Sequence, residues 1–133
     1  MEFKLHERLA ADTVFVANWS LSRVLLMNDV RYPWLILVPR CENITELFEL
    51  LPEDRATLIE EIARASERLK AATRAAKINI GALGNTVPQL HIHIVARNPG
   101  DATWPGPVWG HGAAVPYEDA ARKTMLEKVR ASG

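Results

Sequence analysis

Residues 89–95 read Gln-Leu-His-Ile-His-Ile-Val, and this stretch decides how the rest of the chain is organised. Polar side chains at positions 89, 91 and 93 alternate with aliphatic ones at 90, 92 and 94. Successive side chains of a strand point to opposite faces of a sheet. The pattern therefore predicts a strand that buries its aliphatic residues and displays Gln89, His91 and His93 together on the other face. Two imidazoles side by side on a rigid strand make a titratable surface near neutral pH.

A segment rich in small residues, 80–88, comes directly before this strand. Gly81 and Gly84 permit backbone conformations that other residues avoid, and they let a ligand approach the backbone closely. Asn85 and Thr86 then offer short polar side chains beside the start of the strand. The plain structural alternative is a pair of core or surface histidines satisfied by hydrogen bonds. The unusual preceding segment favours a binding site instead.

Length and composition are those of one globular domain. The chain has 133 residues, enough to bury most of its apolar surface in a single core. Apolar residues make up 48% and charged residues 24%, which is normal for such a domain. The 16 basic and 16 acidic residues give zero net charge, and no block of like charge occurs. We therefore expect neither a nucleic-acid polymer nor a membrane surface as a partner.

Cysteine content and hydropathy bear on where the protein works. Cys41 is the single cysteine, so an internal disulfide cannot form, which suits a reducing compartment. No apolar run is long enough to span a bilayer, and residues 1–6 lack the apolar core of a signal peptide. These features predict a cytoplasmic protein.

Five apolar runs are typical of strands. Three of them are separated by short connections, which predicts an antiparallel meander. The run at 34–38 is continuously apolar, so we expect it to be covered on both faces. The predicted strands are 13–19, 21–27, 34–38, 77–82 and 90–97.

Helical patterns occupy the middle and the end of the chain. Asn43 stands three residues before Glu46 and predicts a capped helix over 44–50. A longer helix begins at Pro52, with apolar residues at spacings of three and four and with its charged residues expected in solvent. A terminal helix is predicted over 117–131. Helices on one face of an antiparallel sheet give an α+β domain.

The loop after the last strand contains two tryptophans, Trp104 and Trp109, among prolines and glycines. This composition predicts an ordered loop. Exposed tryptophans on such a loop often stack on ligands or anchor interfaces. The equal alternative is that they cover the local core.

Taken together, the segment Gly-Asn-Thr-Val-Pro-Gln-Leu-His-Ile-His-Ile at 84–94 resembles the signature of the histidine triad (HIT) family. That signature is His-φ-His-φ-His-φ-φ, with φ apolar, preceded by Gly-Gln/Asn-Ser/Thr-Val. Gln89 occupies the first histidine position, and His91 and His93 occupy the second and third. The resemblance extends from about residue 14 to residue 111. It implies a single HIT-like domain over 1–133, with a core at about 14–111, a C-terminal loop and helix at 112–133, and a homodimer.

The sequence resembles the nucleotide-binding and diadenosine polyphosphate hydrolase-like branch of the family, and this resemblance also implies a chemistry. A hydrolase or nucleotidyl transferase would act on the α-phosphate of a nucleoside phosphate ester, anhydride or phosphoramidate, through a covalent intermediate at His91. A backbone carbonyl near the third histidine would orient this nucleophile. The implied catalytic residues are His91, His93 and Gln89. The implied substrate contacts are Asn85 and Thr86 with phosphate, Asn28 and Asp29 with ribose, Met27 with the base, and Asn79 if the alignment shifts by one residue.

Two other functions stay open. In a metalloenzyme, the His-x-His pair would bind one ion, with His6 or His111 completing the site. No spaced acidic residue or cysteine pair supports this, and Gln89 removes the obvious third ligand. The expected chemistry requires no cofactor, and the sequence leaves a metal open.

The third possibility is a nucleotide-binding or interaction protein with little turnover. Gln89 favours it because an amide cannot titrate. Trp34 does so as well, because many HIT relatives carry histidine after glycine at that strand entry, where this chain has Pro33-Trp34. The nucleophile His91 is nevertheless present, so altered substrate choice is the better expectation.

Overall fold

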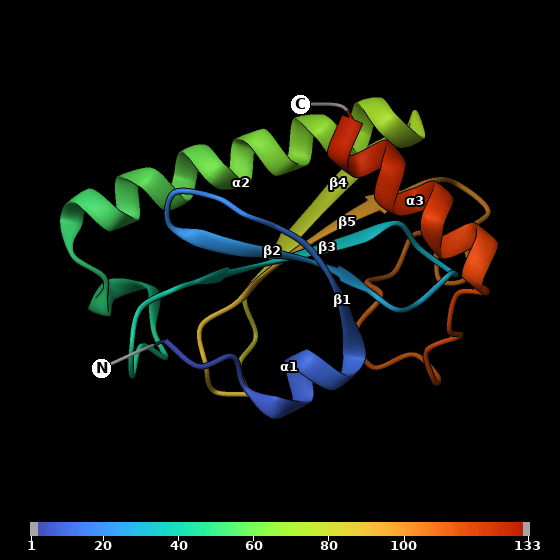
Figure 1. Cartoon of the computed structure of the whole chain (residues 1–133). Helices are drawn as coiled ribbons and strands as arrows, with labels where there is room; N and C mark the ends of the chain where they lie inside the picture. Colours follow the sequence, from blue (N-terminus) through green and yellow to red (C-terminus); the bar gives the residue numbers. More distant parts are fainter. Residues whose placement is uncertain (1–2, 132–133) are drawn as a thin grey trace.

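A computed structural model describes residues 3–131 and contains a five-stranded antiparallel sheet in the order β1-β2-β3-β5-β4 (Figure 1). The strands are β1 (Thr13–Asn18), β2 (Ser22–Met27), β3 (Trp34–Pro39), β4 (Lys77–Gly81) and β5 (Ile92–Arg97). The first three form the predicted meander, and β5 inserts between β3 and β4. The α+β class and the five-stranded antiparallel sheet are confirmed.

Helices lie on both faces of the sheet. They are α1 (Glu7–Asp12), the 3-10 helix η1 (Leu47–Glu49), α2 (Pro52–Thr73) and α3 (Asp119–Ala131). The predicted helices α2 and α3 cover one face, whereas the short α1 lies on the other (Figure 1). The sequence pattern does not predict α1, whose six residues are too few to show an apolar period. The His6 side chain caps this helix by accepting a hydrogen bond of 3.1 Å from the Arg8 N–H.

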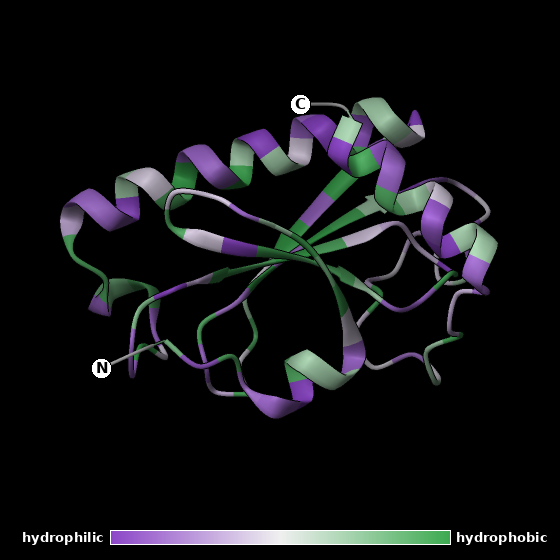
Figure 2. Cartoon of the chain, viewed as in Figure 1, coloured by the Kyte–Doolittle hydropathy of each residue, from purple (hydrophilic) through white to green (hydrophobic). Residues whose placement is uncertain are grey.

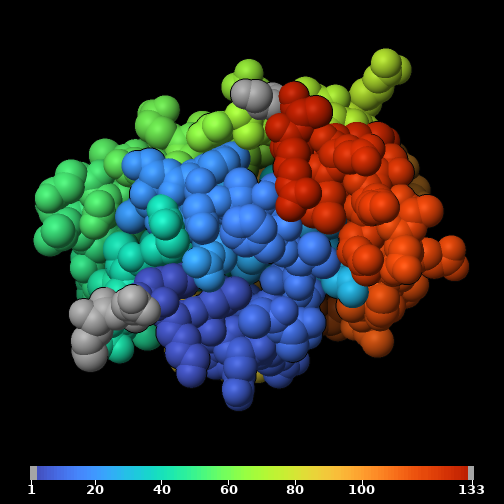
Figure 3. All heavy atoms as spheres, in the orientation of Figure 1, coloured from blue at the N-terminus to red at the C-terminus, as the bar shows by residue number. Residues whose placement is uncertain are grey.

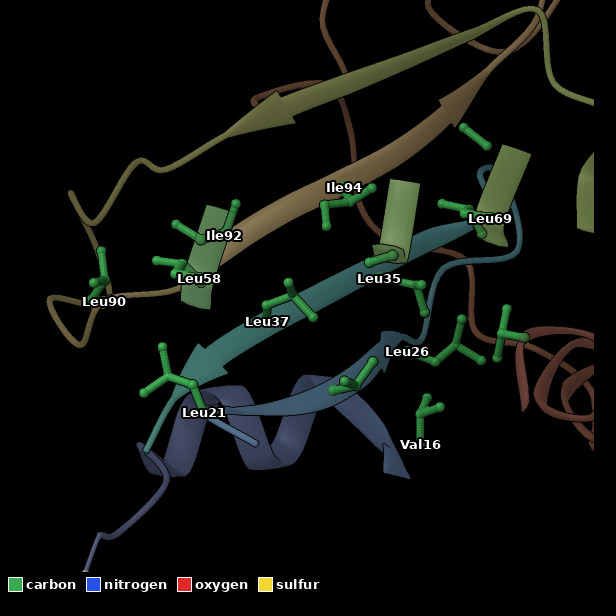
Figure 4. Packing of buried hydrophobic residues seen from close by; sticks show 14 of the residues in the cluster. Val16, Leu21, Leu26, Leu35, Leu37, Leu58, Leu69, Leu90, Ile92 and Ile94 are labelled. Carbon is green, nitrogen blue, oxygen red and sulfur yellow. The ribbon is translucent and has the colours of Figure 1, made fainter. Parts of the chain in front are cut away.

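The larger core lies between α2 and the sheet (Figure 4). Leu58, Ala65 and Leu69 form the buried face of α2, while the outer surface of this helix is mostly hydrophilic (Figure 2). The aliphatic residues of the histidine motif enter the same core, as predicted: Leu90, Ile92 and Ile94.

One charge of α2 is not in solvent as expected. Glu61 is buried, and its carboxylate accepts hydrogen bonds of 3.0 Å each from the backbone N–H groups of Leu21 and Ser22. The carboxylate therefore satisfies buried donors at the start of β2, which compensates for the loss of its hydration.

A second core lies on the opposite face of the sheet. Trp34, Ile36 and Val38 of β3 point into it, and Leu9 of α1 packs with them. Leu35 and Leu37 belong to the first core. Strand β3 is therefore buried on both faces, which confirms the prediction from its continuous apolar run.

Several element bounds differ from the prediction. Strand β5 begins at Ile92, so His91 lies just before it. The helix predicted over 44–50 is only the short η1, and its capping box joins Glu46 and Glu49 instead of Asn43 and Glu46. Leu51 precedes Pro52 and has an extended backbone, because the proline ring disfavours a helical conformation at the residue before it. A helix that begins after Asn43 must therefore end before Leu51. Helix α3 begins at Asp119. No helix within residues 3–131 is long and apolar enough to cross a membrane.

Candidate active site

A cavity of about 630 Å³ opens on the sheet face that carries α1. Its walls come from α1, the end of β2, the segment before β5 and the loop after β5. His91 and His93 both line it. The volume is in the range of small-molecule binding sites.

His91 is held by its own backbone neighbour. Its Nδ1 lies 2.6 Å from the carbonyl oxygen of Gln89. A carbonyl only accepts, so Nδ1 carries the proton and donates it to this oxygen. The Nε2 atom of neutral His91 is then left with a free lone pair. The carbonyl that orients His91 therefore lies two residues before it, and not near His93 as the resemblance implied.

His93 has the opposite tautomer. The indole N–H of Trp34 donates a hydrogen bond of 3.0 Å to Nδ1 of His93. An indole nitrogen is only a donor, so Nδ1 is unprotonated and Nε2 carries the proton. Burial lowers the pKa of His93 from 6.5 to about 3, with a smaller contribution from the nearby His91. His93 is therefore a neutral N–H donor throughout the physiological pH range.

The two imidazoles lie beside each other, with ring centroids 4.8 Å apart and an interplanar angle of 71°. Trp34 and Trp109 each place a ring 5.6 Å from the His93 ring. The Trp109 indole lies against Gly81 of β4, which has no side chain. A Cβ added at Gly81 would lie 2.9 Å from the indole, so only glycine leaves room for Trp109 here. Trp109 packs on the second core, which is one of the two alternatives for the loop, and it also lines the cavity. Its stacking on a ligand stays a prediction.

The segment before β5 forms the wall beside the histidines. Gly84 has a φ of 75°, in the left-handed region that favours glycine. Asn85 and Thr86 follow it and line the cavity. The structure thus brings these two side chains to the same cavity as His91 and His93, and their contact with a phosphate stays a prediction.

Of the three candidate residues at the end of β2, two line the cavity and one does not. Met27 and Asp29 line the cavity. Asn28 is not among the lining residues, and its Oδ1 accepts a hydrogen bond of 2.9 Å from the backbone N–H of Tyr117. Asn28 therefore ties the C-terminal segment to β2.

Asp29 is almost fully buried and already has several partners. Arg31 forms an ion pair of 2.9 Å with it, and the backbone N–H groups of Arg31 and Val115 donate to its carboxylate. Burial alone raises the pKa of Asp29, but these hydrogen bonds outweigh burial and lower it. The carboxylate is thus ionised, and much of its accepting capacity is used within the protein.

Asn79 lies on β4 and is not brought to the cavity. Its Oδ1 accepts a hydrogen bond of 2.9 Å from Arg97. Arg97 is buried, forms an ion pair of 2.7 Å with Asp101, and donates to Thr103. This network fixes the loop that follows β5, and sequence analysis did not identify it.

Gln89 is not among the residues that line this cavity, but together with His91 it lines a smaller pocket beside it. Its Oε1 accepts a hydrogen bond of 2.8 Å from the backbone N–H of His6, and its Nε2 donates one of 2.9 Å to the carbonyl of Lys4. These bonds join Gln89 to the N-terminal segment, which packs on the sheet face that carries the cavity, so Gln89 shares that face with the two histidines as predicted.

The cavity lining also includes polar residues that were not predicted as substrate contacts, among them Arg8, Arg31 and His111. Arg31 lies two residues after Asp29, so its place near the polar end of β2 could have been noticed in the sequence, whereas Arg8 lies on α1, which the sequence does not predict. Among residues 3–131, no group of three or more His, Cys, Asp or Glu side chains is arranged to hold a metal ion.

Fold and cavity together define a protein that presents two tautomerically fixed histidines on an antiparallel sheet, and comparison with known proteins agrees. The family model described as HIT domain matches residues 8–100. The chain therefore belongs to the HIT family.

Solved structures are similar over nearly the whole chain. A histidine triad protein from Sinorhizobium meliloti 1021 is 48% identical, covers 98% of this chain and 96% of its own, and has a TM-score of 0.96. One from Marinobacter aquaeolei VT8 is 45% identical, covers 99% and 96%, and has a TM-score of 0.97. One from Bradyrhizobium japonicum is 42% identical, covers 99% and 98%, and has a TM-score of 0.97. A search of curated proteins gives no match.

Proposed function

We propose that the protein is a nucleotide hydrolase or nucleotidyl transferase that acts at the α-phosphate of a nucleoside phosphate ester, anhydride or phosphoramidate. The observation that carries the proposal is the pair of opposite tautomers in one cavity. His91 presents a lone pair on Nε2, and His93 presents an N–H on Nε2. A nucleophile beside a donor is the arrangement that covalent phosphoryl chemistry needs.

In the proposed first step, Nε2 of His91 attacks the α-phosphorus. A phosphorus–nitrogen bond forms, and the bond from phosphorus to the leaving group breaks with its electron pair going to the leaving group. The Gln89 carbonyl stabilises the positive charge that the imidazole gains, because it accepts a hydrogen bond from the Nδ1–H group. In the second step, the oxygen of water or of another acceptor forms a bond to the phosphorus, and the attacking group releases its proton to solvent. The phosphorus–nitrogen bond breaks with its electron pair returning to Nε2, which restores neutral His91.

The remaining contacts follow from the cavity lining. His93 donates to a non-bridging phosphate oxygen, as do Asn85 and the hydroxyl of Thr86. Met27 lines the cavity and packs against the second core, and its apolar side chain contacts the base. A homodimer and a cytoplasmic location are part of the same proposal; the homodimer rests on the family, and the location rests on the single cysteine and the hydropathy of the sequence.

A quenched reaction tests the covalent step. A nucleoside substrate labelled at the α-phosphate should leave acid-labile label on His91 of the parent protein. The His91→Gly variant should carry no label and show no turnover. Label on no histidine, with His91→Gly turning over like the parent, overturns the proposal.

A second candidate is a nucleotide-binding protein with little turnover. Its supporting observation is that the Gln89 side chain engages the N-terminal segment and adds no acid or base to the cavity. Binding of AMP without label or turnover, over a series of esters, anhydrides and phosphoramidates, would select this candidate.

A further inference from the structure

The N-terminal segment, residues 3–12, forms part of the cavity wall. Phe3, Leu5 and Leu9 pack against the second core, and Arg8 and Asp12 line the cavity together with Leu9. In the space-filling view this segment lies directly against the residues of the sheet edge that follow it (Figure 3). Its position therefore decides the shape and charge of that side of the site.

Gln89 holds this segment from across the sequence, 83 residues from His6 and 85 residues from Lys4. The carbonyl of residue 4 and the N–H of residue 6 are offered to one amide, which accepts through Oε1 and donates through Nε2. A carboxamide has its acceptor and donor on the same carbon, so it matches such a backbone pair. The two nitrogens of an imidazole diverge from the ring, so histidine at position 89 would make one of these bonds at a time.

Arg8 lines the cavity because residues 3–12 are held in this position. Its ion pair with Asp12 is 3.6 Å long and exposed, a contact of little strength that an anionic ligand can displace. The other cation on the wall, Arg31, is already engaged with Asp29 and with the carbonyl of His111. Arg8 is thus the more available cation for a ligand phosphate.

We propose that Gln89 is a positioning residue whose amide fixes residues 3–12 on the cavity, so that Arg8 contacts the phosphate of the bound nucleotide. The identity of that ligand rests on the proposed function. The clamp between Gln89 and the backbone of Lys4 and His6 does not, and it is tested separately. Gln89 thus contributes to substrate binding indirectly, through residues 3–12.

The test is a double-mutant cycle with Gln89→Ala, Arg8→Ala and the combined variant. Asn18→Ala is the matched control, because it removes an exposed amide from β1 away from the cavity. Hydrogen exchange at the His6 amide reports the clamp. Calorimetric titration with AMP reports affinity, and kcat and KM are measured on any nucleotide that the parent turns over.

We expect Gln89→Ala to lose protection at the His6 amide and to weaken AMP about 3- to 10-fold. Arg8→Ala should weaken AMP by a similar factor while keeping the protection. The combined variant should bind no more weakly than the weaker single variant, because Gln89 acts through Arg8. KM should rise by a larger factor than kcat falls, and Asn18→Ala should match the parent.

Each contrary result would overturn one part of this proposal. Unchanged His6 exchange in Gln89→Ala removes the clamp. Lost protection with unchanged AMP affinity in both single variants removes the role of Arg8, and multiplicative losses in the combined variant remove the route from Gln89 through Arg8. Failure of the parent to bind AMP counts against the proposed function and the Arg8 contact, while the exchange data still decide the clamp.

Discussion

The indole N–H of Trp34 donates a hydrogen bond of 3.0 Å to Nδ1 of His93, and so fixes which nitrogen of His93 carries the proton. Trp34 opens β3, at the position where the resemblance to the HIT family leads us to expect histidine. At first sight it removes a titratable group from the site. In this protein it keeps His93 in the tautomer that donates from Nε2, while burial keeps the ring neutral.

Trp34→Phe tests this relationship. Phenylalanine keeps most of the ring packing but has no donor, so neutral His93 should populate both tautomers. The proposed reaction should slow about tenfold, the equivalent of one neutral hydrogen bond. Ring-nitrogen NMR of His93 should show Nε2 protonated in the parent and a mixture in the variant. Trp19→Phe, beside Arg64 and Arg68, is the control. Identical His93 spectra in parent and variant would exclude the role of Trp34.

His93 should also make stability depend on pH. Its folded pKa, about 3, lies below the ordinary value of 6.5, so the unfolded chain binds the extra proton. The contribution of neutral His93 is fully present above pH 6.5 and is lost as pH falls toward 3, by at most about 1.4 kcal/mol per pH unit. Denaturant unfolding at several pH values should show this loss in the parent. His93→Asn should show a shallower dependence, and parallel curves would contradict the assignment.

Asn85→Ala tests the phosphate contact proposed for the segment before β5. Removal of a charge-assisted hydrogen bond should weaken AMP binding by about 1.5–3 kcal/mol, or about 10- to 150-fold. The melting temperature should stay close to that of the parent, since Asn85 is exposed. Asn18→Ala is again the matched control. An unchanged dissociation constant for AMP would count against the role of Asn85.

How far the sequence predicts the site depends on how local each contact is. The alternation at 89–95 places His91 and His93 correctly, because strand geometry follows from neighbouring residues. The partners of Asn79 and Gln89 were beyond reach. Asn79 meets Arg97 on the adjacent strand, and Gln89 meets a segment more than 80 residues away. Such contacts depend on tertiary structure. Helix α1 was missed for a related reason, since a six-residue helix is stabilised by packing and leaves little pattern.

Assembly is a separate prediction. We expect a homodimer, as the family implies, and large apolar side chains are available on the surface: Phe48 is 76% exposed and Leu51 is 60% exposed. Light scattering at micromolar concentration should give twice the chain mass of 14.8 kDa. A monomeric mass would contradict the prediction.

The Gln89→His variant tests whether residue 89 acts on the nucleophile His91 or on the N-terminal segment. The substitution restores the three-histidine pattern, and the backbone carbonyl of residue 89 remains to hold Nδ1 of His91. Turnover should therefore persist, with label still trapped on His91. The new imidazole, however, makes only one of the two bonds to the N-terminal segment, so KM for a nucleotide should rise and the substrate profile should change. Measured kcat and KM for esters, anhydrides and phosphoramidates would show this. If Gln89→His abolishes label on His91, the residue at position 89 acts on the nucleophile directly. If KM is unchanged for every substrate, the N-terminal segment takes no part in binding.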